Sequence, residues 1–240
     1  MGLLDSLLGG PDRTFRKHAE RVANKRAQAI DRSASIEYLA SERTADAVDA
    51  LLARFTYSTE PTITDQEEKS RVFEAIVDAG EVALEPVRDF LAHVESLTWP
   101  MKILAELLQP ADLVTELLGI VEELETEYER DPQRKIQAIS FLEELSDPRI
   151  APAISRFLED ANETVRFHAA GVLLAQKDEE EARTKLLERL SREESVRVRL
   201  RIAEGLADLG WGVQGYRAAV EKVLPEGFAI QSNGQIKKRG

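Results

Sequence analysis

Histidine, cysteine and clustered carboxylates are the side chains that most often hold metals or perform catalysis. This 240-residue chain has no cysteine, which excludes a disulfide scaffold, thiolate zinc sites, iron–sulfur clusters and a cysteine nucleophile. Its three histidines, His18, His93 and His168, stand apart, and none belongs to a His-Glu-x-x-His pair. The sequence therefore predicts no metal site and no cofactor.

Carboxylates are abundant, with 44 Asp and Glu residues, and several lie close together. The runs over 122–127 and 178–181 could supply a catalytic acid and base or form solvated helix faces, and the general excess of acid favours helix faces. The chain lacks a glycine-rich phosphate loop between a strand and a helix, and it lacks a Gly-x-Ser-x-Gly elbow. We therefore expect a protein that is not an enzyme.

The charge balance limits the classes of partner that the protein can bind. The net charge is −12, and residues 34–221 alone carry −18, which opposes binding to nucleic acid. No apolar run approaches the ~20 residues that span a bilayer, and no secretory signal begins the chain, so we predict a cytoplasmic protein that does not bind membranes. The start, Met-Gly-x-x-x-Ser, fits either the loose pattern for N-myristoylation or a short amphipathic turn.

Two apolar templates alternate along the chain. The first has apolar or small residues at i, i+1, i+3 and i+4 of a helical face, as over 169–173, and its six copies end at residues 39, 76, 107, 142, 173 and 206. The second places an apolar pair three residues after a single position, as in Ile154, Phe157 and Leu158. Because copies of the two templates interleave, the sequence predicts repeats of about 33 residues, each made of two antiparallel helices.

Together with the Asp-Pro helix starts at 131–132 and 147–148, the templates define six helix pairs and a terminal helix. The pairs are 12–32/33–42, 44–55/67–80, 82–96/99–109, 110–127/132–146, 148–160/163–177 and 178–190/195–210, and the terminal helix is 213–224. Alternation of apolar and polar residues around Asn233-Gly234 predicts a β-hairpin with a two-residue turn. This hairpin either caps the last repeat or offers a strand edge to a partner. The predicted regions are an N-terminal segment (1–11), a helical solenoid (12–224) and a hairpin or tail (225–240).

The stretch from Asp147 to Leu173 resembles the HEAT-repeat family, in particular the HEAT-like repeats of phycobilin lyases. It carries Asp147-Pro148-Arg149, Phe157-Leu158-Glu159-Asp160 and Val165-Arg166-x-x-Ala169-Ala170-x-Val172-Leu173, and the second half returns over 198–206. The resemblance implies an all-α fold, a right-handed, armadillo-like α-solenoid, followed here by the small hairpin. Members of this family mostly serve as binding scaffolds, and the second helix of each pair usually lines the concave surface.

Charge differs between the two helices of the pairs. Windows in five second helices sum to +6, whereas windows in five first helices sum to −11. The basic residues of the second helices are Lys69, Arg71, Lys102, Arg134, Lys135, Arg166, Arg197, Arg199 and Arg201. We expect them to bind an acidic protein or peptide segment on the concave face, because arginine holds carboxylates in a two-pronged geometry. A structural role is the alternative for Arg166, which could pair with Asp160, and for Arg199.

Residues 56–66 are predicted to form an eleven-residue loop that interrupts the regular plan. Its Tyr57 and Ile63 are further candidates for partner binding, although the loop could equally be an inert insertion. The predicted function is that of a protein–protein interaction scaffold or adaptor. Two alternatives are the handling of a linear tetrapyrrole, as in bilin lyases, and DNA binding or repair, as in HEAT-like glycosylases; the acidic body opposes the second.

Overall fold

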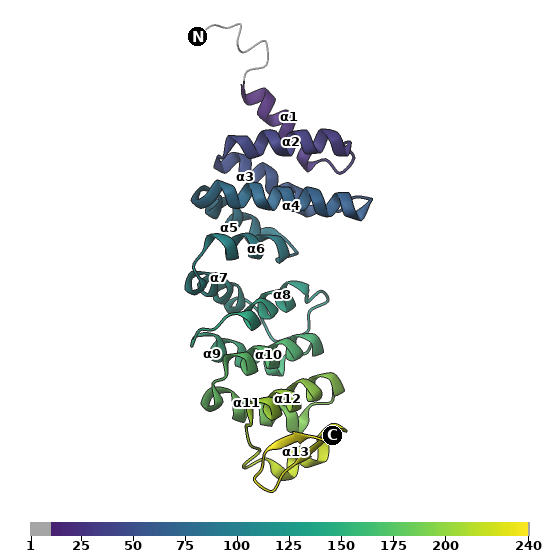
Figure 1. Cartoon of the computed structure of the whole chain (residues 1–240), viewed down its shortest axis with the longest axis vertical. Coiled ribbons are helices and arrows are strands. Elements are labelled where there is room, and N and C mark those ends of the chain that lie inside the picture. The colour runs from purple at the N-terminus through teal and green to yellow at the C-terminus, as the bar shows by residue number, and fades with distance from the viewer. Residues whose placement is uncertain (1–10, 240) are drawn as a thin grey trace. The chain divides into compact units, whose positions relative to one another are not determined.

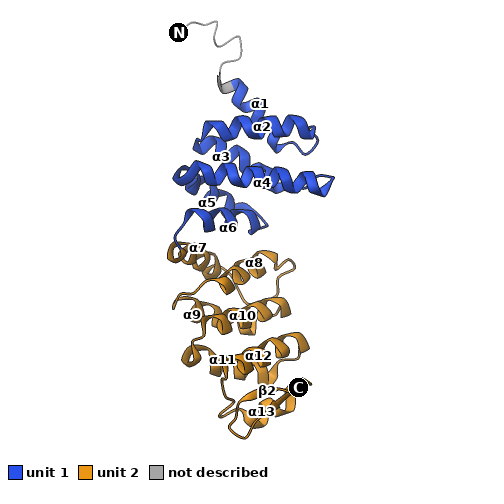
Figure 2. Ribbon diagram, viewed as in Figure 1, with its two compact units in different colours: residues 1–109 blue, residues 110–240 orange. Residues whose placement is uncertain are grey.

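Helices make up most of the residues that the structure, a computed structural model, describes, which are 11–239 with side chains from residue 13 onward. Contacts divide the chain into unit 1, which ends at residue 109, and unit 2, which begins at residue 110 (Figure 2). Each unit is described by itself. The predicted N-terminal segment, except its last residue, and the myristoylation pattern lie outside the described residues.

Unit 1 follows the predicted alternation. Its first helices are α1 (Pro11–Ala23), α3 (Ala45–Leu52) with the 3-10 turn η1 (Ala53–Thr56), and α5 (Leu84–His93), which follows the turn η2 (Gly80–Ala83). Its second helices are α2 (Ala29–Glu42), α4 (Thr62–Ala79) and α6 (Thr98–Leu107). First helices pack on first helices and second helices on second helices, so the unit has two layers (Figure 1).

Unit 2 repeats this arrangement. Its first helices are α7 (Pro110–Glu122), α9 (Ile150–Ile154) with η4 (Ser155–Glu159), α11 (Glu179–Arg192) and α13 (Arg217–Val223). Its second helices are α8 (Gln133–Phe141) with η3 (Leu142–Glu144), α10 (Glu163–Gln176) and α12 (Val196–Leu209). The α10 helix packs between α8 and α12. The predicted all-α solenoid of helix pairs is therefore confirmed.

The two templates supply the hydrophobic core. Five of the six residues that end copies of the first template are fully buried leucines or isoleucine: Leu39, Ile76, Leu142, Leu173 and Leu206. The second template buries Val48, Val114, Ile154 and Phe157 on the facing helices. Each such side chain contributes roughly 1.5–3 kcal/mol when it leaves water. The core is thus a continuous seam between the two layers of each unit.

Side-chain caps fix several helix starts. Thr44, Asn162, Asp178 and Ser195 each accept a hydrogen bond from a backbone N–H in the first turn of the helix that follows. Such caps contribute about 1 kcal/mol each, because they satisfy N–H groups that have no partner within the helix.

The C-terminal hairpin is present, but its turn differs from the prediction. Strands β1 (Phe228–Ile230) and β2 (Ile236–Lys238) pair antiparallel, with Ile230 opposite Ile236. Five residues connect them instead of two, because Gln231 and Gln235 hydrogen-bond across the connection and Gly234 takes a left-handed φ of 86°. Phe228 and Ile236 are buried, and the hairpin packs on α12 and α13. It therefore caps the last repeat.

Two predicted boundaries in unit 1 were wrong. The helix predicted over 12–32 ends at Ala23, because Asn24 starts a turn, and residues 29–32 begin α2 instead. The predicted loop over 56–66 is mostly helix, since α4 begins at Thr62 and leaves only residues 57–61 between η1 and α4. The polar residues at the start of α4 suggest a loop in the sequence, but several of them point into the unit.

A buried ionic network explains why α4 starts early. Arg54, which is fully buried, donates to Asp65 Oδ1 at 2.6 Å and to Glu68 Oε2 at 2.8 Å. Arg32 of α2 donates to both oxygens of Glu68 at 3.0 Å, and Lys69 lies 2.8 Å from Asp65. The network joins α2, η1 and α4. Burial alone would raise the pKa of Asp65, but hydrogen bonds from Lys69 and Arg54 lower it to about 2.

Removing the central carboxylate of this network should destabilise unit 1. We predict that Glu68→Gln lowers the free energy of unfolding by about 3–5 kcal/mol, because Arg32 and Arg54 then remain buried without their shared carboxylate. Chemical denaturation followed by the fluorescence of Trp99, which stacks on Phe55 in unit 1, measures the change. The exposed neighbour provides the control: Glu67→Gln should stay within about 0.5 kcal/mol of the natural protein.

Candidate interaction surface

A basic residue recurs at one position of the second helices, seven residues before the end of each first-template copy. We call this the ladder position. It is occupied by Arg32, Lys69, Lys135, Arg166 and Arg199, and by Pro100 in the third repeat. The position lies at the edge of the buried helix face, from which a long side chain can reach the neighbouring repeat.

In unit 2, the ladder residues bind acids in the turns between helices. Lys135 Nζ lies 3.0 Å from Asp160 Oδ2, and Lys135 is only 1% exposed. Arg166 donates to both carboxylate oxygens of Glu193 at 2.9 Å. In both pairs, the acid belongs to the turn that precedes the next second helix. Each pair therefore ties one repeat to the following one.

The Arg166–Glu193 pair shifts the protonation of its acid. Burial would raise the pKa of Glu193, but hydrogen bonds from Arg166 and from the backbone N–H of Ser195, with the nearby charge of Arg189, lower it to about 2. The same interactions raise the pKa of Arg166. Glu193 is thus ionised in the folded protein over the whole ordinary pH range.

Several of the predicted partner-binding residues are therefore internal. Lys69 and Lys135 are buried and ion-paired, and Arg166 is bound to Glu193 and to the backbone oxygen of Asp160. The expected exposure of Lys69 and Lys135 was wrong, because their side chains turn toward carboxylates. The alternative structural interpretation of Arg166 agrees with its contacts, although its main ionic partner is Glu193 and not Asp160.

The remaining predicted residues lie at or near the surface. Arg71 donates to Ser33 Oγ and to the backbone oxygen of Glu67, and exposed Lys102 lies over the ring of Trp99 at 5.1 Å. Arg134 is half-buried at the start of α8. Arg199 is half-buried and faces α13, where it donates to the backbone oxygen of Val223.

Arg197 and Arg201 are brought together on one aromatic ring. The guanidinium carbons of both arginines lie over the ring of Phe167, 4.0 Å from its centroid for Arg197 and 5.2 Å for Arg201. Arg201 also donates to Glu143 Oε2 at 2.7 Å, and the other oxygen of Glu143 lies 2.7 Å from His168 Nδ1. We call Glu143, Phe167, His168, Arg197 and Arg201 the arginine–phenylalanine cluster. It joins η3, α10 and α12.

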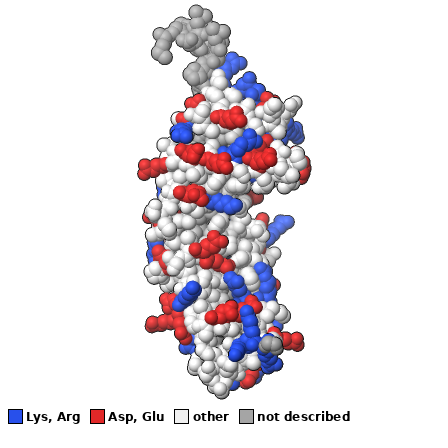
Figure 3. Space-filling view, viewed as in Figure 1, with Lys and Arg blue, Asp and Glu red and all other residues white. Residues whose placement is uncertain are grey.

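Charges are unevenly placed around the cluster. Arg197 is exposed, and its one hydrogen bond, to Thr164 Oγ1, is long at 3.4 Å. Arg201 has two fixed contacts. Its Nη2 forms an ion pair with Glu143, and its guanidinium group lies over the ring of Phe167. In the lower part of Figure 3, which corresponds to unit 2, Lys and Arg side chains gather along the right side of this view. A carboxylate can approach Arg197 from solvent without breaking an ion pair.

Gly171 provides space for the cluster. A Cβ atom at this helical position would lie 2.5 Å from Arg201 Nη2 and 2.8 Å from Glu143 Cδ. Gly171 is also buried in α10, where glycine costs helix stability. Because Gly171 has no side chain, the Glu143–Arg201 ion pair can occupy the space beside this position of α10.

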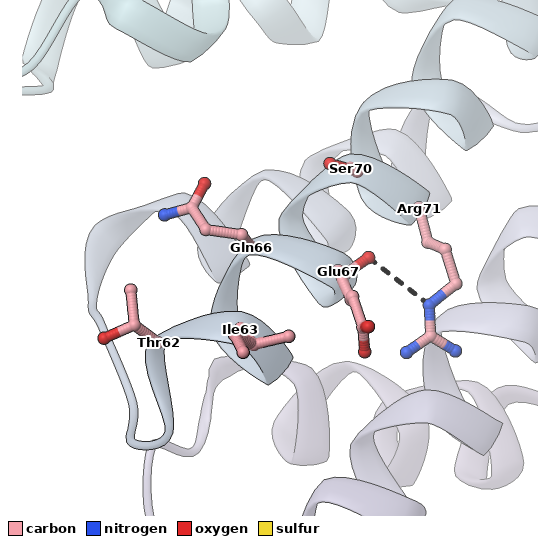
Figure 4. A pocket seen from close by; sticks show the side chains of 6 residues that line it. All are labelled: Thr62, Ile63, Gln66, Glu67, Ser70 and Arg71. Atoms are coloured by element: carbon pink, nitrogen blue, oxygen red, sulfur yellow. Dashed lines mark hydrogen bonds between the residues drawn. The ribbon is translucent and has the colours of Figure 1, made fainter.

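The loop candidates lie on a separate surface in unit 1. Ile63 is 74% exposed at the start of α4 and borders an open hollow of about 770 Å³ (Figure 4). In Figure 4, Ile63, Glu67 and Arg71 project from one side of α4. Tyr57 is half-buried, and its hydroxyl donates to the backbone oxygen of Val22. Tyr57 thus holds α1 against the end of η1, whereas Ile63 remains available.

A comparison with known protein families finds a match to most of unit 2. The family profile described as HEAT repeats matches residues 118–222, which include the ladder residues Lys135, Arg166 and Arg199 and the arginine–phenylalanine cluster. Residues 118–222 are thus similar to HEAT repeats. The HEAT repeats of unit 2 and the helix pairs of unit 1 share the same templates, although the profile match covers unit 2 alone. No curated protein matches the sequence significantly.

HEAT repeats generally form scaffolds for protein interactions and are typically not enzymes. Within residues 11–239, no helix is both long enough and apolar enough to cross a bilayer. Over the same residues, no three His, Asp or Glu side chains converge as metal ligands. The similarity to phycobilin lyases in particular stays a prediction.

Replacing Gly171 should disturb the cluster. Gly171→Ala gains helix propensity of up to about 1 kcal/mol but displaces the ends of the Arg201 and Glu143 side chains, and loss of this partly exposed ion pair costs at most about 1 kcal/mol, so we predict less stabilisation than at an open helical position. Gly119 of α7 is the matched control, since a Cβ there meets nothing within 4 Å and Gly119→Ala should stabilise. Thermal denaturation of both variants measures the difference; equal stabilisation would contradict the packing argument.

The lowered pKa of Glu193 predicts acid sensitivity of unit 2. Because this pKa is about 2 in the folded protein and near 4.5 when unfolded, the Arg166–Glu193 pair stabilises fully above about pH 4.5, and the gain is lost as the pH falls toward 2. Amide hydrogen exchange of α10 and α12 between pH 6 and 2.5 should show this loss. Glu193→Gln should weaken the pH dependence, whereas Glu194→Gln, at an exposed position, should leave it unchanged.

Proposed function

We propose that the protein is an interaction scaffold that binds an acidic segment of a partner protein on the second-helix layer of unit 2, centred on the arginine–phenylalanine cluster. The observation that carries this proposal is the pairing of Arg197 and Arg201 over Phe167, with Arg197 exposed and free of any ion pair among the described residues. The HEAT repeats support the general role of a scaffold.

The chemistry of the cluster suits a carboxylate next to an apolar group. Arg197 can donate two parallel N–H groups to one carboxylate, which is the geometry that arginine favours. Phe167 supplies an apolar surface beneath the two guanidinium groups, and stacking on it limits the freedom that Arg197 loses when it binds. Arginine and aromatic side chains of this kind dominate the binding energy of protein interfaces.

Charge sorting supports the same surface. Among the first helices of unit 2, α7 carries acids and no basic residue, and the first turn of α11 holds Glu179, Glu180 and Glu181. An acidic partner is therefore repelled from these parts of the first-helix layer and attracted to the exposed arginine of the second-helix layer. Such complementarity sets the orientation of binding and its rate.

Reversal of one exposed charge tests this proposal. Arg197→Glu should lower the capture of acidic partners at least tenfold, since it removes the exposed guanidinium and repels carboxylates. Quantitative affinity purification with the full-length protein, compared with Lys25→Glu, measures the effect. Lys25 is an exposed lysine in unit 1, so this control makes the same change in net charge.

Two results would contradict the proposal. Equal loss of the same partners in Arg197→Glu and Lys25→Glu would show that only total charge matters. Full retention in Arg197→Glu, with the fold intact by circular dichroism, would show that the cluster does not bind partners.

A further inference from the structure

The ladder ends in an incomplete pair at Arg199. Its Nη1 donates to the backbone oxygen of Val223 at a long 3.4 Å, and its Nε is buried with no hydrogen-bond partner among residues 11–239. Within these residues, no carboxylate lies at ion-pair distance from Arg199, whereas Lys135 and Arg166 each bind one. Arg199 is the last ladder residue among residues 11–239, where α12 is followed by α13 and the hairpin and not by the turn of another ladder pair.

A pocket of about 420 Å³ opens beside Arg199, between the start of α12 and the end of α13. Its walls are mainly apolar, and Arg199 and Lys222 make it basic. It is lined by Val196, Arg199, Leu200, Lys222, Val223, Leu224, Pro225 and Glu226. Val196 is 58% exposed and lies at the mouth of the pocket.

Among residues 11–239, Glu226 is an acid that also lines the pocket, but its carboxylate forms no ion pair with Arg199. The backbone N–H of Phe228 donates to the oxygen of Pro225, and Gly227 has a left-handed φ of 87°, so Glu226 lies in the exposed corner of a tight turn that leads into β1. Strand pairing fixes this turn further, because Arg239 N donates to Gly227 O at 2.7 Å. Glu226 therefore does not complete the pair.

The complete pairs show which ligand fits a ladder residue. In both complete pairs of unit 2, the acid follows a buried apolar residue by three positions: Asp160 follows Phe157, and Glu193 follows Leu190. The acid also accepts the backbone N–H two residues later, which folds it back toward the basic side chain. A segment with an apolar residue, two spacers and an acid thus carries both the carboxylate for Arg199 and an apolar side chain for the pocket.

We propose that this pocket binds such an apolar-x-x-acid segment of a partner protein, which takes the place of the turn of a next repeat. A second copy of the chain fits less well, because the hairpin already buries the apolar end of α12 through Phe228 and Ile236. The site is separate from the arginine–phenylalanine cluster. Arg197 and Arg199 are two residues apart in α12 and so point about 200° apart around the helix.

A synthetic peptide with the sequence of the segment around Glu193 is a direct probe of the pocket beside Arg199. The twelve residues Leu187–Val198 contain Leu190 and Glu193, and their net charge is zero, so they report little nonspecific attraction. Fluorescence anisotropy should detect binding of the labelled peptide to the full-length protein. We expect Arg199→Gln to weaken this binding at least tenfold, and a peptide with Glu193→Gln to weaken it equally. Combining both changes should cause no further loss.

Further variants separate this site from the proposed scaffold surface. Val196→Glu, which places a carboxylate at the exposed mouth of the pocket, should also abolish peptide binding, whereas Arg197→Glu should not change it. Failure of Arg197→Glu to lose partners would therefore leave the pocket unaffected. The melting temperature of each variant confirms that the fold is retained.

Three outcomes would overturn the proposal. The first is no binding of the peptide to the natural protein, and the second is equal binding to Arg199→Gln. The third concerns Glu226: if Glu226→Gln and Arg199→Gln lower the melting temperature by the same amount, and the double variant adds nothing, Glu226 fills the site itself. We expect Glu226→Gln to leave the melting temperature unchanged.

Discussion

The ion pair between a ladder residue and the acid of the next turn is the interaction on which the order of these repeats depends. Apolar burial holds two helices together but has no preferred direction, so it tolerates sliding of one repeat against the next. The Arg166–Glu193 pair does not, because displacement by one turn would leave the buried carboxylate of Glu193 without its partner. We infer that the ladder sets the register, while the leucine seam supplies most of the stability.

The sequence was sufficient to predict the fold, since helical period, interleaved templates and Asp-Pro starts are local signals. The prediction failed where charged residues that are far apart in the sequence determine the local structure. Residues 56–66 have the composition of a loop, yet residues 62–66 are helical, and Asp65 among them binds the buried Arg54. The hairpin turn likewise depends on cross-strand hydrogen bonds that a dipeptide signal does not contain.

The candidate site could be predicted only in part. Summing charges over second helices identified nine basic residues, but a sum does not separate a buried charge from an exposed one. Lys69, Lys135 and Arg166 are neutralised by acids of the same unit, so much of the apparent basic excess belongs to the ladder. The spacing of the ladder position was visible in the sequence and could have marked these residues. The contact of Arg197 with Phe167 could not be foreseen, because the two residues come from different repeats.

One position in the ladder has no basic residue. Pro100 occupies it in α6, and the boundary between the two compact units follows directly after that helix. In a linear array, each repeat is stabilised by its own helices and by coupling to its neighbours, so a weak coupling divides the array into blocks. Because α6 lacks the basic residue of an ion pair such as those of Lys135 and Arg166, we expect each compact unit to unfold as its own cooperative block.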